Sequence, residues 1–328
     1  MICIIYLMTK CGLVVFIFLI KKGEESRIMN AWIFYLMLAL APWGNLGNQD
    51  DNLNQVCSSI YESAIIRSEV DTKVIHYTNQ AIFLTYHHLD ENESFVTISP
   101  AKFNQHLQIL KENHYNVIPI EDYSCFLEHR KSIPPNAVVI TFDDGYRSFY
   151  EMAYPLLKKQ GFPATNFVVV SYLDSDYPSL PFLTWKQTQE MKHDGFSFYS
   201  HSYNLHQKKR GDGGSAVPAL TNRLFLEQEK RLETEEEWRK RVHEDLWMAE
   251  AMLKTQLDNK LSMLCFPFGE YNQTVMDDAK EVGFRYFITT KEGINSGDSR
   301  EITRLNVGMP YISADNFLKK LQSYDRKK

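Results

Sequence analysis

The stretch Ala137-Val-Val-Ile-Thr-Phe-Asp-Asp-Gly-Tyr146 decides the fold. Its first six residues are apolar or β-branched, which is typical of a strand buried on both faces of a parallel sheet. Two carboxylates and a glycine follow where this strand should end. Because successive side chains of a strand point to opposite faces, Asp143 and Asp144 should face different ways. One can then bind a metal while the other accepts a proton, although a turn that caps the following helix explains these residues equally well.

Apolar strands alternate with helical segments along the chain from residue 77 onward. Besides 137–142, the pattern predicts strands at 81–86, 117–120, 166–170, 196–200, 262–266 and 286–290. It predicts helices at 99–113, 150–160 and 185–193, and a long helix that begins after Thr234, where Glu237 completes a capping box. This order is typical of an α/β fold in which helices cover a parallel sheet or barrel.

Polar or turn-forming residues follow four of the predicted strands. They are His87-His88, Asp143-Asp144-Gly145, His201 and Pro267-Phe268-Gly269. In parallel sheets and barrels, functional groups gather at the carboxyl ends of the strands. We therefore expect these four strand ends to form a single site.

The segment His201-Ser-Tyr-Asn-Leu-His206 favours a metal at that site. A spacing of five does not place two imidazoles on one helical face, so we expect a loop that turns both rings toward one ion. Two histidines and an aspartate leave room for water and substrate, as in open catalytic metal sites. Such an ion lowers the pKa of its bound water to ~7 and polarises a carbonyl, and a nearby carboxylate can act as general base.

Three segments, Thr141–Tyr146, His201–His206 and Cys265-Phe-Pro-Phe-Gly269, resemble the motifs of the NodB-homology polysaccharide deacetylases, carbohydrate esterase family 4. Further runs make the chain similar to the PgaB/IcaB type, the N-deacetylases of poly-β-1,6-N-acetylglucosamine: Thr85–His88, Ser148–Glu151, Leu183–Trp185, Asn222-Arg223 and Trp238-Arg239. The resemblance covers about residues 77–325 and implies a distorted (β/α) barrel with fewer strands than the full eight.

The resemblance also implies a metal centre and a proton-transfer pair. Asp144, His201 and His206 are the expected ligands of one divalent metal. Zinc suits them best, with Co²⁺, Ni²⁺ or Fe²⁺ as alternatives. Asp143 is the expected general base, and His87 the general acid for the leaving amine. His88 is the alternative acid, because only one of two neighbouring strand residues can face the site.

The remaining expected site residues contact the substrate or support the base. The resemblance implies that the backbone N–H of Tyr146 stabilises the oxyanion and that Trp185, Pro267 and Phe268 wall the sugar pocket. Many family members have Pro-Tyr-Gly where this chain has Pro267-Phe268-Gly269, so the missing hydroxyl should change sugar contacts but not the metal. Arg304 either steadies Asp143 or pairs on the surface.

The first 46 residues predict an anchor or a signal region. Apolar stretches at 2–20 and 31–41 flank a basic loop at 21–27, which suggests a helical hairpin with that loop in the cytoplasm. Alternatively, the second stretch is the apolar part of a signal peptide, or translation starts at Met29 and residues 1–28 are not translated. Residues 47–76 should form a linker with a short helix near 58–68, and 77–328 the deacetylase domain.

Each of these interpretations exports the domain, so we expect it on the extracellular face of a Gram-positive-type bacterium, membrane-anchored or secreted. The five scattered cysteines do not predict a disulfide framework, and a net charge of -5 gives no reason to expect a nucleic-acid partner. The expected partner is a β-linked N-acetylglucosamine polymer, first of all a biofilm exopolysaccharide. The alternatives are a deacetylase of peptidoglycan or chitin oligomers, and a non-catalytic glycan-binding module that has lost a ligand or the base.

Overall fold

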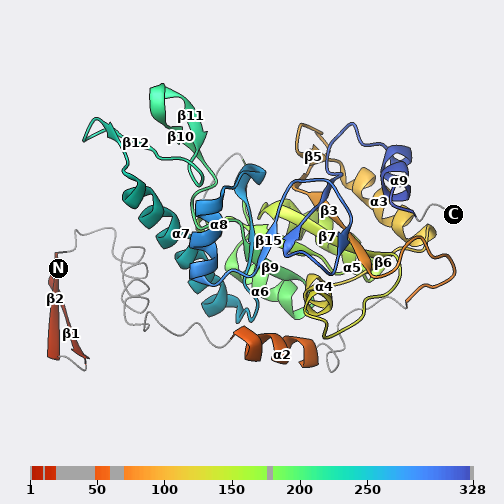
Figure 1. Ribbon diagram of the computed structural model, residues 1–328, viewed down its shortest axis with the longest axis horizontal. Helices are drawn as coiled ribbons and strands as arrows, with labels where there is room; N and C mark the ends of the chain where they lie inside the picture. Colours follow the sequence, from red (N-terminus) through yellow and green to blue (C-terminus); the bar gives the residue numbers. More distant parts are fainter. Residues whose placement is uncertain (1, 10–11, 20–48, 60–69, 176–179, 326–328) are drawn as a thin grey trace. The chain divides into compact units, whose positions relative to one another are not determined.

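The computed structural model describes residues 2–9, 12–19, 49–59, 70–175 and 180–325, in one unit of Met1–Leu46 and another of Gly47–Lys328. Over the described residues, the larger unit is built on a ten-stranded sheet that curls into a nearly closed barrel (Figure 1). In spatial order the strands are β16 (Asn295–Ser296), β3 (Gln80–Tyr86), β7 (Ala137–Asp144), β8 (Thr165–Val168), β9 (Ser197–Ser200), β14 (Met263–Cys265), β15 (Tyr286–Ile288) and β17 (Glu301–Ile302), with β18 (Leu305–Asn306) also beside β3 and β6 (Asn116–Val117) beside β7.

Neighbouring strands of this sheet are parallel, except for the antiparallel pair β16–β3. At one edge of the sheet β17 pairs with β15, and β18, which follows β17 almost directly in the chain, pairs with β3 on the opposite side. The short segment between β17 and β18 therefore connects the two sides of the sheet. Thr303 and Arg304 are the residues between β17 and β18. The predicted distorted (β/α) barrel is therefore confirmed, and Arg304 lies where the barrel closes.

Alternate residues of the central strands pack on opposite faces. Phe83 and Val139 belong to the cluster inside the barrel, whereas Leu84 and Ile140 belong to the cluster beneath the surrounding helices. All eight residues of β7 are buried, since both of its faces are covered. This agrees with the unbroken apolar run of its sequence.

Helices surround the barrel, and those predicted at 99–113, 150–160, 185–193 and after Thr234 are confirmed within a few residues. The surrounding helices are α3 (Pro100–Glu112), α4 (Ile120–Leu127), α5 (Tyr154–Gln160), α6 (Trp185–His193), α7 (Glu235–Leu257), α8 (Gln273–Val282) and α9 (Ala314–Gln322). A π-helical turn at Phe149–Ala153 precedes α5, and Gly161 ends it in the left-handed region. Both hydrogen bonds of the capping box that Thr234 and Glu237 predict are present at the start of α7.

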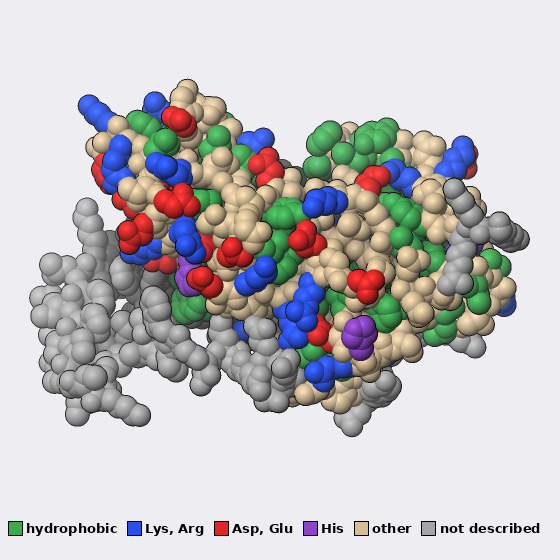
Figure 2. Space-filling model, in the orientation of Figure 1, with side chains coloured by type: hydrophobic (Ala, Val, Ile, Leu, Met, Phe, Trp, Pro, Cys, Tyr) green, Lys and Arg blue, Asp and Glu red, His purple; other side chains and the backbone are tan. Residues whose placement is uncertain are grey.

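In the larger unit, the described residues form three short β-pairs outside the barrel. They are β4 (His88–Leu89) with β5 (Thr97–Ile98), β10 (Lys208–Arg210) with β11 (Ala216–Pro218), and β12 (Phe225–Leu226) with β13 (Arg231–Leu232). The last two project at the upper left of Figure 1. Figure 2 shows basic and acidic side chains interspersed over them and over the face as a whole.

The strand predicted at 117–120 is wrong beyond its first residue. β6 ends at Val117, and Ile120 begins α4, directly after Pro119 at the N-cap. A short apolar run does not distinguish a strand from the start of a buried helix. Side chains of α4 such as Ile120 and Tyr123 join the inner cluster, so this helix closes the amino-terminal end of the barrel.

The scattered cysteines predicted no disulfide framework, and the structure has a disulfide between Cys57 and Cys125. Cys57 lies on α2 (Gln49–Ser59), which is placed earlier than the helix expected near 58–68; residues 60–69 lie outside the described residues. Leu53 and Cys57 of α2 pack into the inner cluster. The pairing bridges 68 residues and depends on this packing, which cysteine spacing alone does not reveal.

The first apolar stretch forms strands, not the helix expected there. β1 (Ile2–Thr9) and β2 (Gly12–Leu19) pair antiparallel. Both are rich in the β-branched and aromatic residues that favour strands. The second stretch, 31–41, lies outside the described residues. Within the described ranges, no helix has the length and apolar character needed to span a membrane, so the anchor stays a prediction.

Candidate active site

The two carboxylates end β7 in the way that their sequence suggests. Asp143 and Asp144 pair with Phe167 and Val168 of β8. Asp144 has a φ of 74° and Gly145 a φ of 82°, so the chain turns sharply here. A left-handed conformation is strained for a residue other than glycine, and such strain is concentrated at functional sites. The turn directs the two carboxylates to different partners.

Asp144 faces the two histidines of the predicted loop. Its Oδ1 atom lies 3.5 Å from Nε2 of His201 and 3.3 Å from Nε2 of His206. Nδ1 of His201 is 2.7 Å from the carbonyl oxygen of Cys265 and therefore donates its hydrogen there. Its Nε2 is then the atom with the free lone pair, directed at the same point as Oδ1.

These three residues fit a divalent metal. Oδ1 of Asp144 is buried, and none of the described residues provides it with a hydrogen-bond partner. A buried carboxylate oxygen without a partner is costly unless a cation neutralises it. Burial and the neighbouring His206 lower the pKa of His201 to about 4, which keeps its imidazole neutral, as metal binding requires. Two imidazoles and one carboxylate could hold such an ion and leave positions open for water and substrate.

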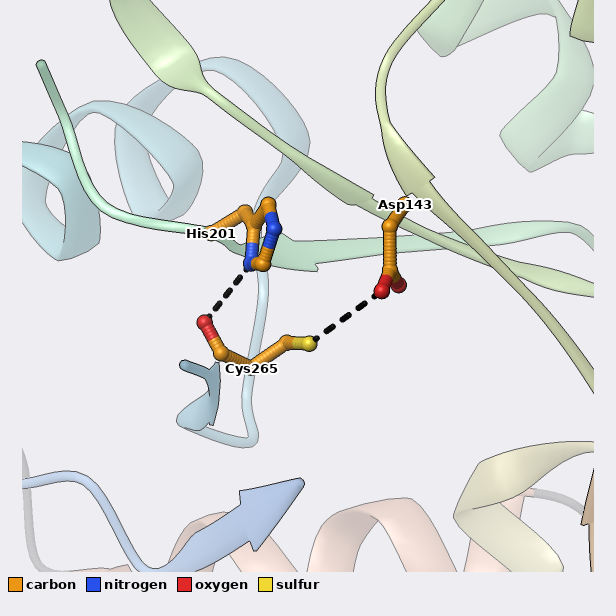
Figure 3. Close-up of side chains that lie close together, drawn as sticks. All are labelled: Asp143, His201 and Cys265. Carbon is orange, nitrogen blue, oxygen red and sulfur yellow. Dashed lines mark hydrogen bonds between the residues drawn. The ribbon is translucent and has the colours of Figure 1, made fainter. Parts of the chain in front are cut away.

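A second cluster, Asp143, His201 and Cys265, fits a metal less well (Figure 3). Both oxygens of Asp143 already accept hydrogen bonds from Arg304, at 2.7 and 2.8 Å. Burial raises the pKa of the Cys265 thiol well above its usual value, whereas metals bind the thiolate. The thiol lies 3.6 Å from Oδ2 of Asp143 as a weak donor, so it packs against the carboxylate and does not compete for an ion.

Arg304 pairs with Asp143 inside the barrel and not on the surface. Its side chain is 1% exposed, and its guanidinium also donates to the carbonyl oxygen of Thr289 and the hydroxyl of Thr141. Although burial by itself raises the pKa of Asp143, the charge of Arg304 and its hydrogen bonds hold that pKa well below its usual range. Asp143 is therefore an oriented, ionised carboxylate beside the metal-binding residues.

The structure brings His87, and not His88, to the side of Asp143. Nε2 of His87 lies 3.9 Å from Oδ2 of Asp143, and Nδ1 of His87 is buried without a hydrogen-bond partner in the described part of the chain. His88 bonds the Thr97 hydroxyl through Nδ1 and packs edge-on against the ring of Tyr146. The geometry thus agrees with one histidine facing the site, as strand alternation predicts.

The Tyr146 backbone N–H is oriented away from the segment that pairs with it. Arg147 N–H donates to Pro181, and Leu183 N–H donates to the carbonyl of Gly145. In an antiparallel pair the residue between two such bonds directs its own N–H to the opposite side. This leaves the Tyr146 N–H available for an oxyanion, and that role stays a prediction.

The expected sugar-pocket residues differ in how closely the structure ties them to the site. Phe268 has a φ of 59°, is 41% exposed, and its ring centroid lies 4.4 Å from that of His206. Pro267 is buried beside it in a single helical turn. Trp185 begins α6 and packs partly buried against the outer cluster, so its contact with sugar stays a prediction.

Sequence reasoning missed one residue that supports the loop between the two predicted metal-binding histidines. Asp245 of α7 accepts the backbone N–H groups of Tyr203 and Asn204, between His201 and His206. A signal was present, because Asp245 lies three residues after Val242 and directly before Leu246, on the apolar face of the helix. A carboxylate at a buried position needs partners, and here they belong to the histidine loop.

Known proteins resemble this chain in sequence and in structure. Residues 130–287 match the family model of polysaccharide deacetylase. The poly-β-1,6-N-acetyl-D-glucosamine N-deacetylase of Escherichia coli K12 is 26% identical over 232 residues, or 66% of this chain, and the chain spans only 34% of that relative's length. The Staphylococcus epidermidis protein of the same name is 23% identical over 278 residues, which cover 80% of this chain and 90% of its own.

A solved de-N-acetylase from Aggregatibacter actinomycetemcomitans superposes with a TM-score of 0.66 at 27% identity, covering 73% of this chain and 99% of that one. IcaB from Ammonifex degensii has the same fold, with a TM-score of 0.63 at 24% identity over 75% of this chain and 98% of its own. Residues 130–287 therefore match a polysaccharide deacetylase domain, and the chain shares its fold with a solved de-N-acetylase. The chain's homologues include the poly-β-1,6-N-acetylglucosamine N-deacetylases, as the sequence motifs predicted.

Proposed function

We propose that this protein is a metal-dependent hydrolase that removes N-acetyl groups from an extracellular poly-β-1,6-N-acetylglucosamine. The observation that carries the proposal is the convergence of Asp144, His201 and His206 beside an ionised Asp143. A glycan-binding module that had lost catalysis would lack one of these groups, and all four are in place. The names and identities of the relatives support the choice of polymer.

The residues divide the chemistry of amide hydrolysis among them. A divalent metal bound by Asp144, His201 and His206 would supply an activated water and polarise the acetyl carbonyl. Asp143, held in place by Arg304, takes the proton of the attacking water. The Tyr146 N–H donates to the developing oxyanion. His87 gives a proton to the amide nitrogen as the C–N bond breaks, so that acetate and a free sugar amine form.

We also propose that the domain acts outside the cell, membrane-anchored or secreted. The disulfide between Cys57 and Cys125 supports this location, because disulfides persist in oxidising compartments and are rare in the cytosol. A polymer outside the cell is the matching substrate. Its free amines would make it cationic and help it adhere to anionic surfaces.

The test is acetate release from matched polymers. The full chain, stripped of metal and reloaded with Zn²⁺ or Co²⁺, would be incubated with poly-β-1,6-N-acetylglucosamine, peptidoglycan and chitin oligomers. We expect metal-dependent release that is fastest from the β-1,6-linked polymer. Faster release from peptidoglycan or chitin would overturn the choice of substrate. Absence of release from all three would contradict the proposed activity.

A further inference from the structure

The loop between His201 and His206 includes a residue in an unfavourable backbone conformation. His201 and His206 lie at its ends, and Ser202 has a φ of 76°, in the left-handed region that residues other than glycine rarely adopt. The loop has no regular structure that would fix its shape. The distance between the two imidazoles therefore depends on what holds the backbone between them.

One side of the loop is held by the segment that follows β8. The backbone N–H of Val170 donates to the carbonyl of Ser202 at 3.1 Å, and that of Ser171 donates to the carbonyl of Tyr203 at 2.9 Å. These bonds secure carbonyl groups. The N–H groups of the loop point elsewhere and need acceptors of their own.

The other side of the loop is held by α7 through a single carboxylate. Oδ1 of Asp245 accepts the N–H of Tyr203 at 2.9 Å, and Oδ2 accepts the N–H of Asn204 at 2.8 Å. Asp245 is 9% exposed. Hydrogen bonds to a charged acceptor are about twice as strong as those between neutral groups, and two of them to adjacent amides fix an orientation as well as a distance.

The helix that carries Asp245 is itself firmly placed. Its first turn has a complete capping box, and the indole N–H of Trp238 donates to the carbonyl of Leu220. Val242, Leu246 and Ala249 on the same face are fully buried. Burial of a charge in this apolar face is costly, and the two amide bonds offset that cost only while the loop keeps its shape.

We propose that Asp245 is a positioning residue for the metal site, which clamps the loop at Tyr203 and Asn204 and so sets the separation of His201 and His206. This inference rests on the proposed function, because it requires that those histidines bind a metal. Mutating a group that contacts a metal ligand but not the metal typically weakens metal binding by about 10- to 100-fold. A merely structural carboxylate on α7 would change stability without changing the affinity.

Glu250 provides the matched control. It lies on the same helix, is 2% exposed, and bonds the hydroxyl of Ser262 and the ammonium of Lys254, neither of which belongs to the histidine loop. Asp245→Ala and Glu250→Ala both remove a buried acid from α7. They should therefore destabilise the metal-free protein in a similar way and differ only at the metal site.

The experiment measures Zn²⁺ affinity of the full-length chain by competition with a chromophoric chelator, together with the thermal midpoint of each metal-free protein. We expect Asp245→Ala to raise the Kd for Zn²⁺ by roughly 10- to 100-fold, with an altered visible spectrum of the Co²⁺ form, and Glu250→Ala to keep the wild-type Kd. Asp245→Asn, whose amide oxygen can accept from one N–H, should fall between wild type and Asp245→Ala. If Asp245→Ala does not fold, the Kd of Asp245→Asn for Zn²⁺ can be compared with that of Glu250→Ala instead.

The outcomes separate this inference from the proposed function. If the wild-type chain binds Zn²⁺ and the Asp245 variants bind it equally well, the positioning role is overturned and the metal site stands. The role is also overturned if Glu250→Ala weakens Zn²⁺ binding as much as Asp245→Ala does. If the wild-type chain takes up no Zn²⁺, the metal site is overturned and the positioning role with it.

Discussion

The two ends of the barrel bury different kinds of side chain. At the carboxyl ends of the strands, charged and strained groups crowd together, with Asp143, Asp144 and Arg304 among the buried residues. At the amino-terminal end, α4 and α2 fill the opening with apolar side chains and the Cys57–Cys125 disulfide joins them. Functional sites are often built at a cost in local stability. We call the carboxyl ends of the strands the open end and the amino-terminal end, covered by α2 and α4, the closed end. We infer that the closed end supplies the stability that the open end lacks.

The largest expected effect comes from removing a metal ligand at the open end. His201→Ala should lose metal binding and catalysis together, because Nε2 of His201 is one of the three converging donor atoms. We expect turnover to fall by about 10³-fold or more, since a proton-transfer group alone contributes 10²–10⁴ and here the activated water is lost as well. Acetate release and zinc content, measured on one sample, check this.

The closed end should respond in stability and not in catalysis. Cys57→Ser removes the disulfide, which closes a loop with a sequence separation of 68. The loop-entropy relation gives a loss of about 4 kcal/mol in the free energy of unfolding. Denaturant titration of the oxidised wild type and the variant measures it. We expect the folded variant to keep the kcat/KM of the wild type. A large loss of kcat/KM would contradict the proposed separation between a stabilising end and a catalytic end.

A buried titratable group, His106, lies on α3, one of the helices that surround the barrel. His106 is fully buried, stacks on Phe317 and bonds the Tyr86 hydroxyl, and burial lowers its pKa to about 4. The unfolded chain takes up a proton near pH 6.5, whereas the folded chain does so only near pH 4. The free energy of unfolding should therefore fall as pH drops through this window.

The full loss attributable to His106 is about 3 kcal/mol below pH 4, from 1.36 kcal/mol per pKa unit. Comparing urea unfolding of the wild type with that of His106→Gln at several pH values isolates this contribution. The variant should show the shallower dependence. Parallel curves for the two proteins between pH 6.5 and 4 would contradict the assignment.

The smallest effect concerns the rim of the open end. Phe268 is exposed beside His206 and stands where many family members have tyrosine. Phe268→Tyr should lower KM for the polymer by a few-fold, since one net hydrogen bond contributes about 1 kcal/mol. Zinc affinity should not change, and a shift in it would mean that this ring positions the metal and not the sugar.

The parts of this structure that the sequence predicts are those governed by local pattern. The apolar run of β7, the capping box of α7 and the five-residue spacing of His201 and His206 indicated the barrel and the convergence of both histidines on Asp144, because each follows from geometry within a few residues. The β-hairpin at β1–β2 was not predicted, because a long apolar stretch is also typical of a membrane helix, even though its β-branched and aromatic residues favour strands.

The missed parts depend on contacts between distant residues. Arg304 and Asp143 are 161 residues apart, so a surface pair was an equal alternative until the closure of the barrel joined them. Cys57 and Cys125 meet only because α2 packs against α4. Asp245 is a polar residue on an apolar helical face, and its partners are backbone groups, which carry no sequence signal at all.

The central claim is that Asp143 moves a proton while Asp144, His201 and His206 hold the metal. The most direct test measures zinc content and acetate release on the same preparation of Asp143→Asn. The account predicts one zinc per chain and a rate lower by about 10²–10⁴. Wild-type turnover in this variant, or loss of its zinc, would contradict the division of roles between the two adjacent carboxylates.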